Sequence, residues 1–202
     1  MARAHSRTLT GITKYLNTPP QSRGTLVREM RSSSGGFDYW LPIKQAATKD
    51  RNTTRDGAAF TAAAANARAD RRGAFGAIAD AWIKTAVPRW AASTAVPVAP
   101  AAVAIGSMEI RVAPQFAEQR PDGLVEIGLV YCNRTALSDF ARNGTLRIIE
   151  RAYPGAIAVL VDLPRAQIHS SEGKRLAKLD PALDAEVVGL HYLLSSPDAV
   201  AA

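Results

Sequence analysis

The chain is poor in cysteine and histidine, and this shortage narrows the chemistry that it can perform. Cys132 is the single cysteine among 202 residues, so an intrachain disulfide and a cysteine-based metal cluster are both excluded. The three histidines are scattered along the chain, whereas a zinc site needs three or four ligands that converge. The sequence therefore predicts no zinc site and does not require an oxidising compartment.

Long apolar runs are also missing. The longest, at residues 91–108, consists mostly of Ala and Val and is interrupted by Pro97 and Pro100, so it is too weak to span a bilayer. Residues 1–16 contain no apolar stretch of signal-peptide length. We therefore expect a cytoplasmic protein with no membrane partner.

A glycine-rich phosphate loop is absent as well. The stretch Ser33-Ser34-Gly35-Gly36 is not followed by Lys and then Ser or Thr, and no predicted strand precedes it. We interpret this stretch as a flexible linker that ends a helix.

Positive charge is abundant, and its distribution is uneven. Residues 1–90 hold 15 Lys and Arg against 6 Asp and Glu, whereas residues 91–202 hold 10 against 12. The whole formal charge of +7 therefore comes from the N-terminal half. Clustered cations gain free energy when they release the counterions of a polyanion, which favours a DNA or RNA partner. The alternative is that these arginines lie on solvated helix faces.

The spacing of apolar residues divides the chain into three parts. Residues 1–90 follow a helical period, residues 91–106 form an Ala/Val/Pro-rich connection, and residues 107–202 contain strands and helices. The connection could also supply a strand near residues 103–105. We expect an α+β or α/β fold, with a basic helical half followed by a small mixed sheet (hairpin, helix, strand) and a C-terminal helix.

Two features organise the helical half. Asp38 is placed to cap a helix that contains Trp40 and Ile43. Residues 57–86 are rich in alanine, which predicts one or two helices there, with a possible joint at residues 71–73.

A hairpin is expected near the middle of the chain. Met108, Ile110 and Val112 alternate with more polar residues, which is typical of a strand. Residues 120–123 read Arg-Pro-Asp-Gly, a strong turn signal, and residues 124–131 form an apolar run that returns as the second strand.

A helix and a further strand follow the hairpin. Residues 135–153 carry one apolar face and predict a helix, although Asn143-Gly144 could bend it. Residues 156–161 form a compact apolar strand, so the two strands and the helix suit a right-handed crossover. The last helix begins at Asp180, which would cap it, with leucine and valine on its buried face.

Acidic residues occur on both strands of the expected hairpin. Glu109 lies on the first strand, Asp122 lies in the turn, and Glu126 begins a Glu-Ile-Gly triplet on the second strand. The order of hairpin, helix and strand, together with these acids, resembles the core of the PD-(D/E)XK nuclease superfamily over residues 103–165.

The resemblance implies a particular site. In that family the hairpin carboxylates hold a divalent metal, and the lysine of an acid-x-lysine triplet orients the attacking water. The catalytic acids would then be Glu109 or Asp122 together with Glu126. Glu109 and Glu126 would bind Mg²⁺, which prefers oxygen ligands. Gly128 stands where the lysine is expected. Without that lysine, no cation from the triplet stabilises the negative charge that develops on the phosphorane. The resemblance therefore implies a degenerate nuclease-like core or, alternatively, a Mg²⁺-dependent nuclease.

Two clusters of arginine are candidates for binding nucleic acid. The first consists of Arg23, Arg28 and Arg31, whose spacings of five and three give a partly shared helical face. The second consists of Arg68, Arg71 and Arg72, whose spacings of three and four place them on one face. The aromatic residues Phe37, Tyr39 and Trp40 could stack on bases, although core packing explains their spacing better.

Cys132 is also a conceivable nucleophile, with His169 or His191 as its base. A nucleophile and its base must lie within hydrogen-bond reach, and no recognisable signature surrounds Cys132. We therefore interpret Cys132 as a structural residue at the end of a buried strand.

Taken together, these patterns favour a nucleic-acid-associated binding protein with no required cofactor, Mg²⁺ being needed only by a nuclease. The alternatives are an assembly subunit that binds a protein partner or forms a homo-oligomer, and a Mg²⁺-dependent nuclease.

Overall fold

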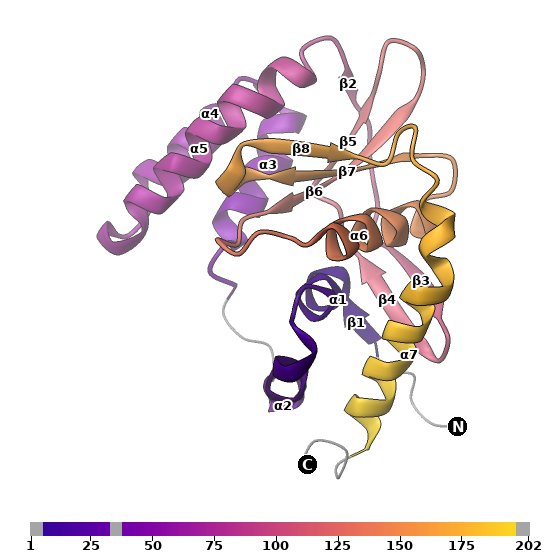
Figure 1. Cartoon of the computed structure of the whole chain (residues 1–202). Helices are drawn as coiled ribbons and strands as arrows, with labels where there is room; N and C mark the ends of the chain where they lie inside the picture. Colours follow the sequence, from indigo (N-terminus) through magenta and orange to yellow (C-terminus); the bar gives the residue numbers. More distant parts are fainter. Residues whose placement is uncertain (1–5, 33–37, 197–202) are drawn as a thin grey trace.

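The computed structural model describes residues 6–32 and 38–196, which form an α+β fold as predicted (Figure 1). The linker at residues 33–36 and Phe37 lie outside the described residues. The α-helices are α1 (Leu9–Leu16), α2 (Arg23–Ser32), α3 (Leu41–Asn52), α4 (Ala58–Ala65), α5 (Ala69–Arg89), α6 (Asp139–Ala152) and α7 (Asp180–Ser195). Short 3₁₀ helices are η1 (Pro20–Ser22), η2 (Leu163–Arg165) and η3 (Leu176–Leu179).

The strands form two sheets. They are β1 (Ser6–Thr8), β2 (Thr94–Ala95), β3 (Ala101–Ile105), β4 (Met108–Val112), β5 (Phe116–Gln119), β6 (Val125–Tyr131), β7 (Ile157–Asp162) and β8 (Gln167–Ser170). The smaller sheet has the order β1-β4-β3, and the larger has the order β2-β5-β6-β7-β8. Within the larger sheet β6 and β7 are parallel, and the other neighbours are antiparallel.

The expected hairpin exists, but its first strand is β5 rather than the segment at residues 108–112. The turn at residues 120–123 is confirmed, and Gly123 adopts a φ of 84° there. The segment at residues 108–112 is β4, which pairs with β3 and β1 in the smaller sheet. Pro114 lies between β4 and β5 and cannot donate a backbone hydrogen bond, so the chain leaves one sheet and enters the other there.

The crossover from β6 through α6 to β7 is confirmed. Ser138 caps α6 by accepting a hydrogen bond from the Ala141 amide (3.2 Å). Gly144 does not interrupt α6, which is one continuous helix. A Cβ atom on Gly144 would lie 3.2 Å from the Leu16 side chain and 3.4 Å from the Leu183 side chain. The glycine therefore permits α6 to pack closely against its neighbours.

The joint between the two alanine-rich helices lies at residues 66–68 and not at residues 71–73. Arg71, Arg72 and Gly73 all belong to α5. A glycine in a helix costs only about 1 kcal/mol relative to alanine, which the alanine-rich surroundings offset.

The C-terminal helix α7 has the buried face that its sequence predicts. Leu183, Val187, Leu190 and Leu194 are all buried. Asp180 does not cap the helix, since its two carboxylate oxygens accept hydrogen bonds from Arg147 at 2.8 and 2.7 Å.

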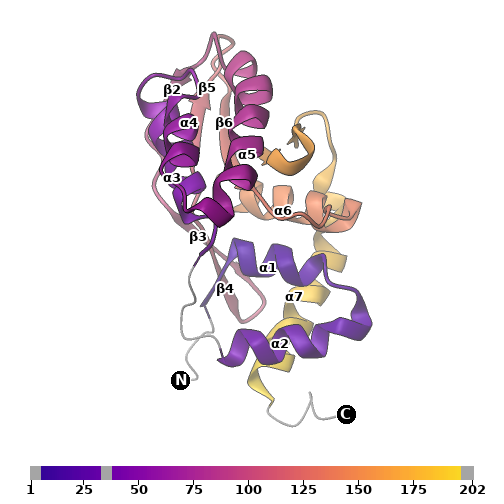
Figure 2. The same cartoon turned by 90° about the vertical axis from the view of Figure 1, so that its left-hand side faces the viewer.

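Two hydrophobic cores cover the two faces of the larger sheet (Figures 1 and 2). Helices α3, α4 and α5 pack on one face, against side chains such as Val130 and Val159. Helices α1, α2, α6 and α7 pack with the smaller sheet on the other side, against side chains such as Leu129 and Leu160. The helices of residues 1–90 are thus divided between both cores, and residues 91–106 add a strand to each sheet. The connection does not separate two independent cores.

Candidate functional site

The three acidic residues that the sequence analysis predicted as catalytic or metal-binding do not converge on one site. Glu109 is exposed on β4 of the smaller sheet, opposite Ala104 of β3. Asp122 is exposed in the hairpin turn and pairs with Arg120 at 2.7 Å. Glu126 is buried on β6. Across residues 6–32 and 38–196, no group of three or more His, Cys, Asp and Glu side chains is arranged to hold a metal ion.

The structure instead brings Glu126 opposite Glu118, an acid that the sequence analysis missed. Glu118 lies on β5 and is in register with Glu126 across the hairpin. Both are buried, with relative exposures of 0% and 1%. Counting back from the turn at residues 120–123, instead of assigning the first strand to residues 108–112, would have found Glu118.

Glu118 is neutralised by arginines from the helical half. Its carboxylate oxygens accept hydrogen bonds from Arg51 Nε at 2.6 Å and from Arg55 Nη2 at 2.7 Å. Ser93 Oγ donates a further one at 3.0 Å. The side chains of Arg51 and Glu118 are fully buried, so this ion pair is held in a low-dielectric environment.

The negative charge of Glu126 is also neutralised by arginine. Arg89 Nη2 donates to one oxygen at 2.7 Å, and the Trp90 indole nitrogen donates to the other. Arg120 lies 3.6 Å away and also pairs with Glu172 at 2.8 Å. A cavity of about 280 Å³ adjoins these groups. Because both hairpin carboxylates already bind arginine, they form a structural ionic cluster rather than an open metal site.

Packing explains why Gly128 is a glycine. A Cβ atom on Gly128 would lie 2.1 Å from Cζ of Phe116, its register partner on β5. The Phe116 ring lies over the glycine and packs edge-on against Trp90, with the ring centroids 4.8 Å apart. A lysine at this position would require the Phe116 ring to move, so the packing favours glycine here.

Some of the excess positive charge of residues 1–90 is neutralised by ion pairs inside the molecule. Arg51, Arg55 and Arg89 of the basic half pair with Glu118 and Glu126 of the acidic half. The excess of arginine in residues 1–90 therefore reflects, in part, ion pairs that join the two halves.

The first arginine cluster mainly holds α2 in place. Arg23 pairs with Glu186 of α7 at 2.7 Å and lies over the Tyr15 ring, 4.8 Å from its centroid. Arg31 donates to the backbone oxygens of Leu193 and Ser196 near the end of α7. Arg28 is exposed and donates to Thr25.

The second cluster lies at the start of α5, where the α4–α5 connection projects beyond the larger sheet (Figure 1). The side chain of Arg68 is 77% exposed and pairs with Asp70 at 3.4 Å. Arg71 lies over the Tyr39 ring, 4.5 Å from its centroid, and Arg72 is exposed. Cations at a helix N-terminus oppose the helix dipole, and the ion pair of Arg68 and the ring contact of Arg71 offset part of that cost.

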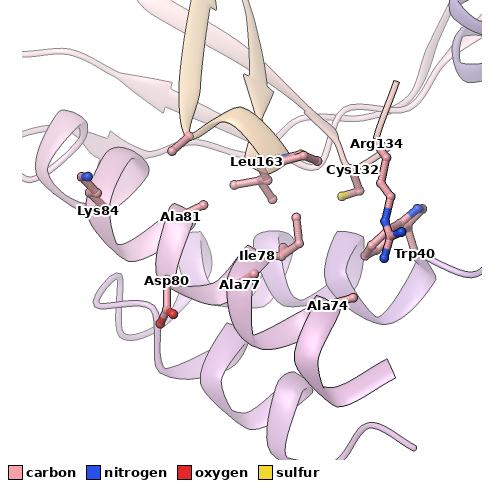
Figure 3. A pocket seen from close by; sticks show the side chains of 12 residues that line it. Trp40, Ala74, Ala77, Ile78, Asp80, Ala81, Lys84, Cys132, Arg134 and Leu163 are labelled. Carbon is pink, nitrogen blue, oxygen red and sulfur yellow. The ribbon is translucent and has the colours of Figure 1, made fainter. Parts of the chain in front are cut away.

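A groove of about 420 Å³ begins one turn further along α5. Its floor is apolar and includes Ala74, Ile78 and Leu163, and Trp40 lies at one end (Figure 3). Arg134 extends from the loop after β6 towards Trp40, whereas Asp80 points away from Leu163. The groove lies at the carboxyl ends of the parallel strands β6 and β7, which is where ligands commonly bind in α/β sheets.

Cys132 lines this groove but is not prepared for nucleophilic chemistry. It is 3% exposed, and burial raises the pKa of its thiol to about 12, so the thiolate is scarce at neutral pH. His169 lies on β8 opposite Leu160, where burial lowers the pKa of its imidazole. His191 lies on α7, whose buried face belongs to the other core.

Comparisons with known proteins add no assignment, since no family model matches the chain and no match was found among curated proteins. Within residues 6–32 and 38–196, none of the helices combines the length and the apolar character needed to cross a membrane.

Proposed function

We propose that the protein binds nucleic acid, without cleaving it, along the start of α5 and the adjoining groove. The observation that carries this proposal is the continuity of the surface. Arg71 lies over the Tyr39 ring, the Tyr39 ring packs against the Trp40 ring with centroids 4.7 Å apart, and the partly buried Trp40 lines a groove together with the exposed Arg134. Arg68 and Arg72 lie beside Arg71 at the start of α5. We call this surface the α5 groove.

The chemistry of the α5 groove suits a phosphate backbone with attached bases. Arginine binds phosphate oxygens bidentately, and each such contact releases counterions. An aromatic ring beside an apolar floor supports base stacking, which contributes about 1–3 kcal/mol per base. Among the residues that the structure describes, neither Arg72 nor Arg134 takes part in an ion pair, so both are available to an anionic ligand.

The ion pairs of the hairpin favour binding over cleavage. If the resemblance to PD-(D/E)XK nucleases reflects the fold of this core, the two hairpin acids correspond to Glu118 and Glu126. Both carboxylates accept hydrogen bonds from arginine, and a metal ion would have to displace those arginines. We therefore propose a degenerate nuclease-like core in which a Mg²⁺ site has been replaced by ion pairs.

The test measures binding of fluorescently labelled DNA and RNA at several salt concentrations. We expect Arg68→Ala/Arg72→Ala to weaken binding and to lower the slope of log Kd against log salt by roughly 0.7–0.9 per lost phosphate contact. Arg175→Ala/Lys178→Ala is the matched control, because it removes two exposed cations elsewhere and should leave the slope unchanged. Absent or salt-independent binding by the unaltered protein would refute the proposal.

Trp40 provides a second readout. Trp82 and Trp90 are 0% and 1% exposed, so Trp40 is the tryptophan that an added ligand can reach. Binding in the α5 groove should protect its fluorescence from acrylamide quenching, and Trp40→Phe should remove that change.

The assembly alternative is supported by one surface. Val188 and Tyr192 lie one turn apart on α7 and are 48% and 62% exposed, which is unusual for large apolar side chains. Light scattering distinguishes this candidate: a stable oligomer that Tyr192→Glu dissociates, and that binds no nucleic acid, would favour assembly.

A further inference from the structure

A second cavity lies on the other side of the loop that carries Arg134. Its volume is about 500 Å³, and it is lined by residues 17–19 after α1, by Lys14, and by parts of the segment at residues 131–135. Arg134 lines both this cavity and the α5 groove. The two hollows therefore meet at one arginine.

The two cavities belong to opposite faces of the larger sheet. Cys132, in the α5 groove, packs in the core formed with α3, α4 and α5. Tyr131, in the second cavity, packs in the core formed with α1 and α6. The loop after β6, residues 132–135, therefore separates the two cavities at the carboxyl edge of the sheet, and we call this loop the crest.

The backbone of this crest is fixed, and its arginine side chain is exposed. Arg165 donates to the backbone oxygens of Asn133 and Arg134, at 2.8 Å each, and is itself held by Asp162. The Tyr131 hydroxyl donates to the Thr135 backbone oxygen at 2.6 Å. A preorganised loop lowers the entropic cost of binding a ligand across it.

We propose that the ligand is a single strand that passes from the α5 groove over Arg134 into the second cavity. This inference rests on the proposed nucleic-acid function and names the class of nucleic acid. Stacking against Trp40 requires an unpaired base, and a path from one cavity to the other over Arg134 requires a flexible backbone. Duplex DNA, by contrast, has a persistence length of about 150 base pairs.

The second cavity has the character that such a strand needs. Its described lining residues include Lys14, which pairs with the exposed Glu29 at 3.2 Å, the Tyr131 ring and the neutral polar residues Asn17, Thr18 and Thr135. None of the lining residues is acidic. Phosphate would contact Arg134 at the crest, and the next nucleotide would enter a polar hollow. DNA and RNA single strands share this chemistry, so both are tested.

The experiment compares Thr135→Glu with Thr94→Glu. Both residues are exposed, but Thr135 lines the second cavity and Thr94 lies on β2 at the far edge of the sheet. The probes are single strands of about 12 nucleotides as DNA and as RNA, the matching duplex, and a mononucleotide. Thermal unfolding of both variants verifies that they are folded.

We expect Thr135→Glu to weaken binding of the single strands at least about tenfold, because its charge repels phosphate, and to leave mononucleotide binding unchanged. Thr94→Glu should have no effect, and the duplex should bind more weakly than the strands. If Thr135→Glu behaves like Thr94→Glu, or weakens strand and mononucleotide equally, or if the duplex binds as tightly, this inference is overturned while the α5 groove stands. If the unaltered protein binds none of the probes, the proposed function fails as well.

Discussion

At the scale of single residues, the most consequential groups are the two buried hairpin glutamates and the arginines that meet them. Desolvation of a carboxylate costs several kcal/mol, and only a well-placed cation with further hydrogen bonds offsets that cost. Glu118 has two arginines and Ser93, and Glu126 has Arg89 and Trp90. These pairs tie α3 and α5 to the β5–β6 hairpin across the boundary between the basic and acidic halves.

Replacing Glu118 tests this role. We expect Glu118→Gln to lower the free energy of unfolding by about 3–5 kcal/mol, because it leaves the fully buried Arg51 without its counter-charge. Glu172→Gln removes a carboxylate that is 45% exposed and should cost less than about 1 kcal/mol. Urea titration measures both, and equal effects would contradict a structural role for the buried pair.

At the scale of secondary-structure elements, the register of the hairpin fixes which residues meet. Phe116 lies opposite Gly128, Glu118 lies opposite Glu126, and a shift by one residue would turn each of these side chains to the other face. The Phe116 ring then fills the space above Gly128 and contacts Trp90. The glycine and the phenylalanine therefore specify the register together.

A double-mutant cycle tests this pairing. We expect Gly128→Ala to destabilise the protein by about 1–3 kcal/mol through overpacking against Phe116. In the background of Phe116→Ala the same change should cost less, because the obstructing ring is gone. Gly73→Ala is the control: a side chain there meets nothing within 4 Å, so an alanine in this helix should stabilise by up to about 1 kcal/mol. Strictly additive effects at residues 116 and 128 would show that they do not interact.

At the scale of the whole molecule, the larger sheet is the shared wall of two cores. One face is covered by α3, α4 and α5, and the other by α1, α2, α6, α7 and the smaller sheet. Strand β1, from the start of the chain, also pairs with β4 from its middle. Over residues 6–32 and 38–196, each of the two cores contains side chains from both halves of the chain.

This arrangement predicts how fragments behave. Residues 91–202 expressed alone should lack a cooperative thermal transition and show poor dispersion in amide NMR spectra, because side chains such as Val130 and Val159 lose the helices that cover them. The full chain, measured in parallel, should unfold cooperatively. A well-dispersed spectrum from residues 91–202 would instead support two independent domains.

Sequence patterns determined the features whose causes are local. The turn at residues 120–123, the apolar face of α7 and the order of β6, α6 and β7 each depend on a short stretch of chain, so propensity and periodicity predicted them.

The tertiary structure decided the rest. Strand pairing is a non-local choice, so β4 joined the smaller sheet and Glu118 came to face Glu126. The tertiary structure also decided which arginines form buried ion pairs, as Arg51 does, and which stay exposed, as Arg72 and Arg134 do. Charge counts cannot separate these cases, because neutralisation depends on which carboxylate lies within hydrogen-bond distance.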